Sequence, residues 1–185
     1  MSLYIFILAL ISACGNTNET SKNNTDRAVS EVTKPSTEQQ NMIVGKFTKE
    51  DLQQGDFASW FNSGYDQYSP SEEAMEIIKN NISDYEIVGF MGTWCPDSRR
   101  EVPHFFKVLD QAGYDLSKLT MVGVTRNKTT PENLEEGYDL QRVPTFIFMK
   151  DGKEVNRYVE YPRTSIEADI ADIVSGKDYK HSYLR

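Results

Sequence analysis

Residues 92–98 read Gly92-Thr93-Trp94-Cys95-Pro96-Asp97-Ser98 and join a run of strand-forming residues to a helical pattern. A thiol at a helix N-terminus faces backbone N–H groups without partners and the positive end of the helix dipole, and both favour the thiolate. Pro96 at the first helical position costs no helical hydrogen bond. We therefore expect Cys95 to be an exposed, reactive thiol, with Arg99 assisting it. The alternative is a small, buried, inert cysteine.

Patterns on the C-terminal side of this turn predict strands and helices in alternation. Strands are expected at 85–91 and 119–125, and a helix lies between them. An Asp-Gly pair at 151–152 separates two further strand-like runs, 145–149 and 154–161, which is a strong hairpin signal. The final helix has apolar residues at helical spacing before a glycine, namely Ile166, Ile170, Ile173 and Val174.

Two helix starts precede the turn. Thr48 is expected to begin one helix. Ser69 is expected to cap a second, with Pro70 at its first position and Glu72 completing a capping box, and this helix should run to about residue 80. The acidic segment 132–139 is expected to be a solvated helix. The resulting order predicts an α/β fold, an open sheet with helices on both faces.

At this point the chain resembles the thioredoxin-fold family. Residues 94–98 resemble its Trp-Cys-x-x-Cys motif, with Ser98 in place of the second cysteine, and Pro103 matches a proline in its active-site helix. Residues 138–145 resemble the segment that leads to the family's cis-proline. The resemblance implies a thioredoxin-like fold with a central mixed sheet, a catalytic Cys95 and a cis Pro144. It also implies four residues that contact substrate, Trp94, Pro96, Val143 and Thr145, of which Val143 and Thr145 form an edge that pairs with an extended substrate backbone.

Two departures from the family pattern agree with each other. Gly89 stands where thioredoxins place a buried aspartate, and Ser98 cannot act as a second thiol. Cys95 can still form a mixed disulfide, but an external thiol must then release it. We expect protein or small-molecule thiols and disulfides as partners, and Ser98 is expected to donate a hydrogen bond to the thiolate. The resemblance therefore implies a thiol–disulfide oxidoreductase or isomerase of the cell envelope that acts through Cys95 alone. The alternative is a redox-silent thioredoxin-fold module that binds an envelope partner protein. A peroxidase is disfavoured because the Thr and Pro of the peroxiredoxin pattern are not in place.

The first 41 residues predict a signal peptide followed by a disordered tether. Residues 3–11 form an apolar run that is too short to cross a bilayer but typical of a signal peptide, although no Lys or Arg precedes it. Residues 11–14 resemble the bacterial lipobox, which implies lipid attachment at Cys14 and a location in the bacterial cell envelope. The domain boundaries expected are 1–13 for the signal peptide, 14–41 for the lipidated cysteine and a disordered tether, and 42–185 for the folded domain. An ordinary signal peptide is the alternative.

Composition excludes other classes of protein. The 185 residues carry 20 Lys and Arg against 28 Asp and Glu, a net charge of −8, which argues against nucleic-acid binding. With two cysteines and two histidines, none of them at ligand spacing, we expect no metal site. No cofactor is expected either.

Overall fold

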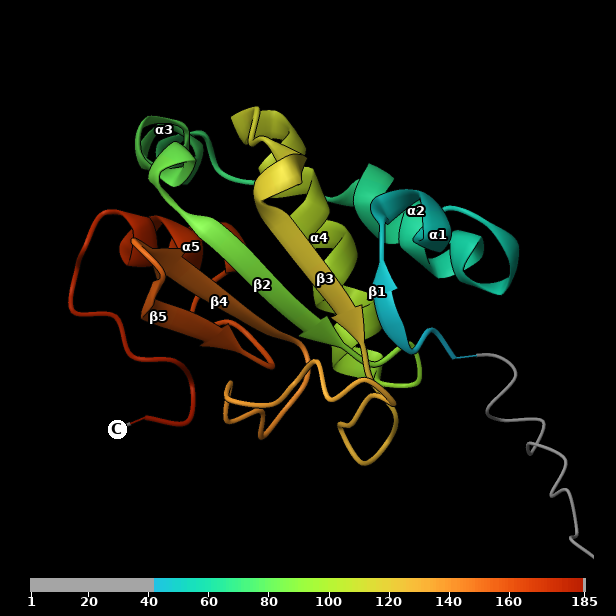
Figure 1. Ribbon diagram of the computed structural model, residues 1–185. Coiled ribbons are helices and arrows are strands. Elements are labelled where there is room, and N and C mark those ends of the chain that lie inside the picture. The colour runs from blue at the N-terminus through green and yellow to red at the C-terminus, as the bar shows by residue number, and fades with distance from the viewer. Residues whose placement is uncertain (1–41, 185) are drawn as a thin grey trace, which may run out of the picture. The chain divides into compact units, whose positions relative to one another are not determined.

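The computed structural model describes residues 42–184, and the fold of this part is a mixed five-stranded sheet (Figure 1). The predicted signal peptide, the predicted tether and the predicted lipid-attachment site at Cys14 lie outside the described residues. The strand order is β1-β3-β2-β4-β5. Only β2 and β3 are parallel, and the other neighbours are antiparallel. The strands are β1 (Gly45–Phe47), β2 (Glu86–Met91), β3 (Leu119–Gly123), β4 (Thr145–Lys150) and β5 (Lys153–Val159).

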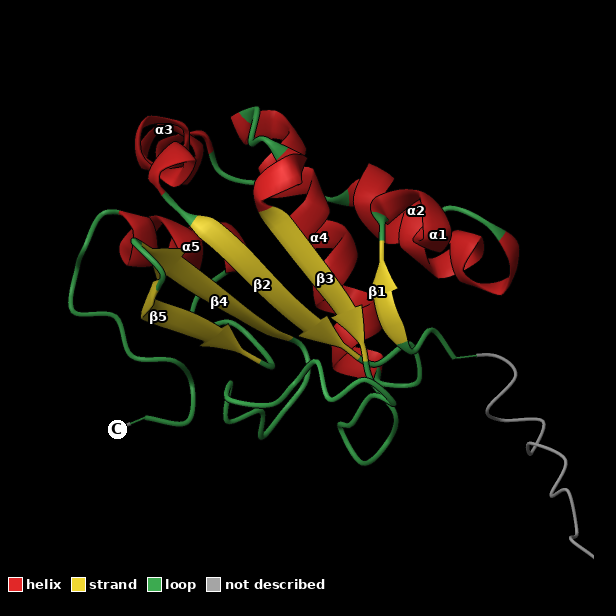
Figure 2. Ribbon diagram, viewed as in Figure 1, coloured by secondary structure: helices red, strands yellow, loops and turns green. Residues whose placement is uncertain are grey.

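The five α-helices of the described part contribute to one core on one face of the sheet, where α2 packs against α4 and α3 packs against α5. Their buried side chains join Ile87, Met91, Phe146 and Phe148 in a single cluster. Figure 2 shows α4 and α5 behind the strands. Pro103 lies within α4, as its match to the proline of the active-site helix in the thioredoxin-fold family implied. The helices are α1 (Lys49–Leu52), α2 (Ala58–Gln67), α3 (Glu72–Asn81), α4 (Pro96–Ala112) and α5 (Ile166–Val174).

The opposite face of the sheet is covered by a loop, so the expectation of helices on both faces is wrong. Phe90, Val122 and Ile147 form a second cluster there, and residues of the 124–144 connection pack on it. The helix expected at 132–139 is absent for a local reason. Asn133, Gly137 and Asp139 have φ values of 54°, 86° and 48°. Left-handed residues this closely spaced cannot belong to a right-handed helix.

The two early helix starts differ in outcome. Thr48 does precede α1, and its N–H donates to the Asp51 carboxylate at 2.8 Å. The cap of α3 is Ser71 and not Ser69, because the Ser71 side chain accepts from the Ala74 N–H. The Ser71 N–H donates to Glu167 of α5 at 3.2 Å, so a long-range contact holds this cap residue. The short strand β1 was not expected.

After α5 the chain returns along β5 as a tail, residues 177–184. Asn156 and Arg163 donate side-chain hydrogen bonds to the backbone carbonyls of Tyr179 and Lys180, at 2.9 and 3.0 Å. The Tyr179 ring is buried in the main core. The tail is therefore part of the folded domain. In residues 42–184, no helix has the length and apolar character needed to cross a membrane.

Candidate active site

Cys95 lies where β2 ends and α4 begins. It is the N-cap residue of α4, with extended backbone angles. Its N–H donates to the Gly92 carbonyl at 2.9 Å, and its own carbonyl accepts from the Arg99 N–H at 3.0 Å. A tight turn and the first helical hydrogen bond thus fix the cysteine at the positive end of a 17-residue helix.

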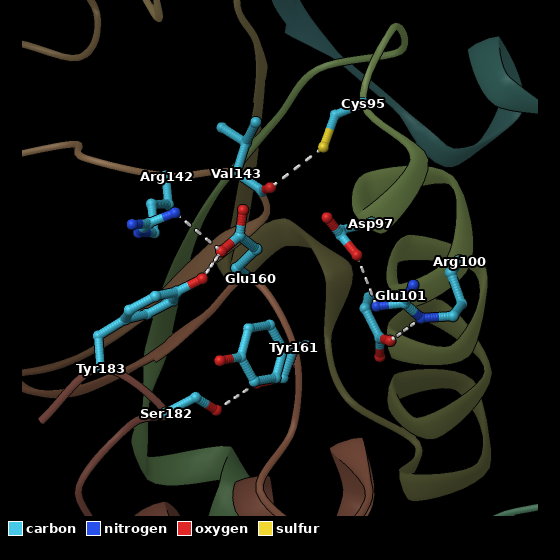
Figure 3. Close-up of polar contacts among 10 residues, drawn as sticks. All are labelled: Cys95, Asp97, Arg100, Glu101, Arg142, Val143, Glu160, Tyr161, Ser182 and Tyr183. Atoms are coloured by element: carbon cyan, nitrogen blue, oxygen red, sulfur yellow. Dashed lines mark hydrogen bonds and ion pairs between the residues drawn. The ribbon is translucent and has the colours of Figure 1, made fainter. Parts of the chain in front are cut away.

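The Cys95 side chain is not exposed, which corrects the sequence expectation. The residue is 6% exposed, and its Sγ donates to the Val143 carbonyl oxygen at 3.3 Å (Figure 3). The loop before β4 covers the cysteine because β4 pairs directly with β2, which brings the start of one strand beside the end of the other. A thiolate has no proton to donate, so this contact must be replaced when Cys95 reacts.

The Val143–Pro144 peptide bond is cis, as predicted. Its surroundings differ from the expected open edge. The Pro144 carbonyl already accepts from the Glu160 N–H at 2.7 Å. Thr145 lies inside the sheet between β2 and β5, is 1% exposed, and donates its hydroxyl to the Arg142 carbonyl at 2.7 Å. Thr145 therefore cannot pair with a substrate backbone, and Val143 remains the candidate.

Ser98 is fully buried at the first turn of α4. Its hydroxyl oxygen accepts from the Gly92 N–H at 3.2 Å, which ties the helix to the end of β2. The hydroxyl proton stays free to donate, so a hydrogen bond from Ser98 to a Cys95 thiolate stays a prediction. A serine at this position can stabilise the turn but cannot form a disulfide.

Neighbouring side chains fill the space beside Gly89, the position at which thioredoxins have a buried aspartate. A Cβ at Gly89 would lie 2.4 Å from Met121 Sδ and 3.1 Å from Phe146 Cδ1. Both of these side chains are buried. An aspartate at residue 89 would need space that the core does not provide.

Three residues near Cys95, namely Trp94, Pro96 and Arg99, differ in their contacts and exposure. The Trp94 indole lies over Gly92 and donates its Nε1 hydrogen to the Val124 carbonyl at 2.9 Å. Pro96 is exposed beside the cysteine. Arg99 donates from Nε to the Thr93 carbonyl at 2.5 Å, so its guanidinium is anchored near the turn.

A hollow of about 420 Å³ opens onto the cysteine. Of the residues chosen from the sequence, it brings together Trp94, Cys95 and Val143. Ser98 and Thr145 are buried away from it. Its wall also contains four polar or charged residues that the sequence analysis did not single out, Lys128, Gln141, Arg142 and Glu160. Gln141 and Arg142 could have been found from their position just before the cis-proline, but Lys128 and Glu160 carried no local signal. Within residues 42–184, no three His, Cys, Asp and Glu side chains are grouped to hold a metal ion.

Comparison with known proteins agrees with this geometry. A sequence model described as thioredoxin matches residues 45–173. The chain belongs to the thioredoxin family. This thioredoxin-family protein is similar to a TPR repeat-containing thioredoxin of Arabidopsis thaliana, with 31% identity over 111 residues. The matched region is 60% of this chain and 28% of that protein. It therefore spans less than a third of the length of that relative.

Two solved structures resemble this chain to different degrees. A Pseudomonas aeruginosa protein of unknown function superposes with a TM-score of 0.55 at 11% identity, covering 72% of this chain and 93% of the other. Fasciola hepatica thioredoxin gives a TM-score of 0.36 at 23% identity over 54% of this chain and 86% of its own. The family model and the mixed five-stranded sheet confirm the α/β thioredoxin-like fold expected from the sequence. Family membership points to thiol–disulfide oxidoreductase chemistry.

Proposed function

We propose that this protein exchanges thiols and disulfides through Cys95 as a single nucleophile and relies on an external thiol to complete each cycle. The observation that carries the proposal is the placement of Cys95 at the N-terminus of α4, hydrogen-bonded to Val143 in the wall of a hollow. Cys95 is the one cysteine in residues 42–184, and serine occupies the position one turn further on. No sulfur within the described domain can therefore resolve a mixed disulfide.

The proposed cycle consists of three successive thiol–disulfide exchanges. The Cys95 thiolate attacks one sulfur of a substrate disulfide RSSR′, a Cys95–S–S–R bond forms, and R′S⁻ leaves and takes up a proton. The thiolate of an external thiol R″SH then attacks the sulfur of R, which forms RSSR″ and releases the Cys95 thiolate. A second external thiol converts RSSR″ to RSH and R″SSR″. Both electrons that reduce the substrate thus come from the external thiols.

The Val143 carbonyl has a defined part in this scheme. In the resting protein it accepts the Cys95 thiol hydrogen at 3.3 Å. A substrate lying along the hollow can replace that donor with one of its own backbone N–H groups. Substrate binding would then free the sulfur as it aligns the disulfide. Trp94 and Pro96 flank the cysteine and supply contact surface beside it.

The test uses the Cys14→Ser chain, in which Cys95 is the one remaining thiol. A peptide carrying a mixed disulfide is reduced by glutathione with and without the protein. The proposal predicts acceleration in proportion to protein concentration, and loss of that acceleration in the Cys14→Ser/Cys95→Ser chain. Equal rates for the two chains would overturn it.

The burial of Cys95 favours one second candidate, a redox-silent binding module that uses the same loop. In that case Cys95→Ser would retain a bound partner, and Pro144→Thr would lose it. An exchange mechanism predicts that a covalent, reductant-sensitive complex disappears in Cys95→Ser.

We also propose that the protein works at the bacterial cell envelope, held by acyl chains on Cys14. The support is the apolar run at 3–11 followed by the lipobox-like residues 11–14. Mass spectrometry of the membrane-extracted protein should find a lipid-modified Cys14 at its N-terminus. A Cys14→Ser chain that stays in the membrane fraction would contradict this.

A further inference from the structure

A second hollow, of about 430 Å³, adjoins the one at Cys95. The two share Gln141 and Arg142 in their walls. One side of the second hollow is formed by Val159 at the end of β5, and the other by the tail residues His181, Tyr183 and Leu184. The two hollows therefore adjoin at Gln141 and Arg142, one at the cysteine and the other at the C-terminal tail, and together they are called the groove.

The tail is a fixed wall of this groove. Ser182 donates its hydroxyl to the Tyr161 carbonyl at 2.7 Å, and the Tyr183 ring packs edge-on against the Tyr161 ring (Figure 3). Tyr179, four residues earlier, donates its buried hydroxyl to Asp169 of α5 at 2.9 Å. Of these residues, Tyr179, Ser182 and Tyr183 lie beyond 45–173, the part matched by the family model.

Arg142 is held at the junction of the two hollows. Its guanidinium carbon lies 3.9 Å from the centre of the Tyr183 ring, and its Nη1 donates to the Glu160 carboxylate at 3.2 Å. The Tyr183 hydroxyl also donates to Glu160. A guanidinium has five N–H groups, and the Arg142 side chain is 47% exposed, so it can bind a further acceptor from solvent without giving up Glu160.

The charge of the groove differs from that of the chain. Three cationic side chains, Lys128, Arg142 and Arg157, line the two hollows, against two anionic ones, Asp139 and Glu160. The whole chain carries −8. Arg157 already binds Glu154 through two nitrogens. Arg142 and Lys128 are therefore the cationic side chains of the groove that would bind a carboxylate of a bound partner.

Resting on the exchange proposed at Cys95, we propose that the second hollow binds the segment of a protein substrate next to its reactive cysteine, and that this segment carries an acidic side chain for Arg142 beside an apolar one for Tyr183 and Val159. Arg142 and Val143 are consecutive. A substrate extended past Val143, at roughly 3.3 Å per residue, passes Arg142 within one or two residues.

The test measures binding without chemistry, on the Cys14→Ser/Cys95→Ser chain, by fluorescence anisotropy. The probes are labelled peptides of the form X-Leu-Cys-Leu-X in which X is Glu, Gln or Lys. The Glu peptide should bind roughly two- to five-fold tighter than the Gln peptide, as expected for half-exposed ion pairs, and the Lys peptide should bind most weakly. Arg142→Glu should reverse the order. Lys153→Gln, a charge removed from the exposed hairpin, should keep it.

Equal affinity for the three peptides, an unchanged order in Arg142→Glu, or no binding at all would overturn this inference. Tyr183→Ala, which removes the ring against Arg142 but keeps every charge, should weaken the preference. Circular dichroism checks that each variant is folded. Exchange with hydroxyethyl disulfide, measured on the Cys14→Ser chain, separates the two proposals: exchange without a peptide preference refutes the groove alone, and a preference without exchange refutes the chemistry alone.

Discussion

Replacing Gly92 by alanine should destabilise the protein through the Trp94 indole. A Cβ on residue 92 would lie 2.5, 2.7 and 2.8 Å from three atoms of that ring. A rigid ring cannot yield by bending, so it must rotate away and lose the 2.9 Å hydrogen bond to Val124. Overpacking costs about 1–3 kcal/mol and the lost hydrogen bond about 1 kcal/mol. The lower entropy of an unfolded alanine chain returns about 0.4–1 kcal/mol. The net loss should be about 1–3.6 kcal/mol.

Urea unfolding followed by circular dichroism measures this loss, and a double-mutant cycle assigns it. In a Trp94→Ala background the ring is gone, so Gly92→Ala should be neutral or slightly stabilising. The coupling free energy between the two sites should then be at least about 1 kcal/mol. Gly92→Ala that stabilises the wild-type chain, or the same loss in both backgrounds, would refute the packing argument.

Three further predictions concern the missing parts of a dithiol site and one buried acid. Gly89→Asp should not restore an assisting acid but should lower the unfolding free energy by at least about 2 kcal/mol, since Met121 fills that space; urea titration measures it. Ser98→Cys should form an internal disulfide with Cys95, so that mass spectrometry no longer finds a glutathione adduct on treatment with oxidised glutathione; a persistent adduct would count against this. Burial raises the pKa of Glu101. A raised folded-state pKa means that stability present below the unfolded pKa of about 4.3 is lost as pH rises through the folded pKa. The stability of Glu101→Gln relative to wild type should therefore increase between about pH 4 and pH 7, and a difference that is flat with pH would argue against it.

The elements that the sequence predicts well are those fixed by near neighbours along the chain. The helix between β2 and β3, the apolar spacing of α5 and the Asp-Gly hairpin between β4 and β5 depend on residues a few positions apart, and all three are confirmed. The turn at Cys95 belongs with them, since Pro96 and the helix that follows carry a local signal.

Other features depend on contacts that a linear pattern cannot carry. Ser71 caps α3 in place of Ser69, and its N–H binds Glu167, which lies 96 residues away in the sequence. Cys95 is buried because the loop ending at Val143 folds over it. Thr145 was expected at an open edge, and the pairing of β4 on both sides closes that edge. The tail at 177–184 had no recognisable pattern, and its place was set by side chains of β5 and the residues that follow it.

The most direct test of the single-thiol account is the rate at which a Cys95 mixed disulfide is resolved. The Cys14→Ser chain is converted to its glutathione adduct, excess reagent is removed, and release of glutathione is followed at increasing concentrations of added thiol. If Cys95 acts alone, the rate of glutathione release should be proportional to the concentration of added thiol and should extrapolate to zero when no thiol is present. A finite rate at zero thiol would contradict it, and so would a folded protein that forms no adduct while the urea-unfolded chain does.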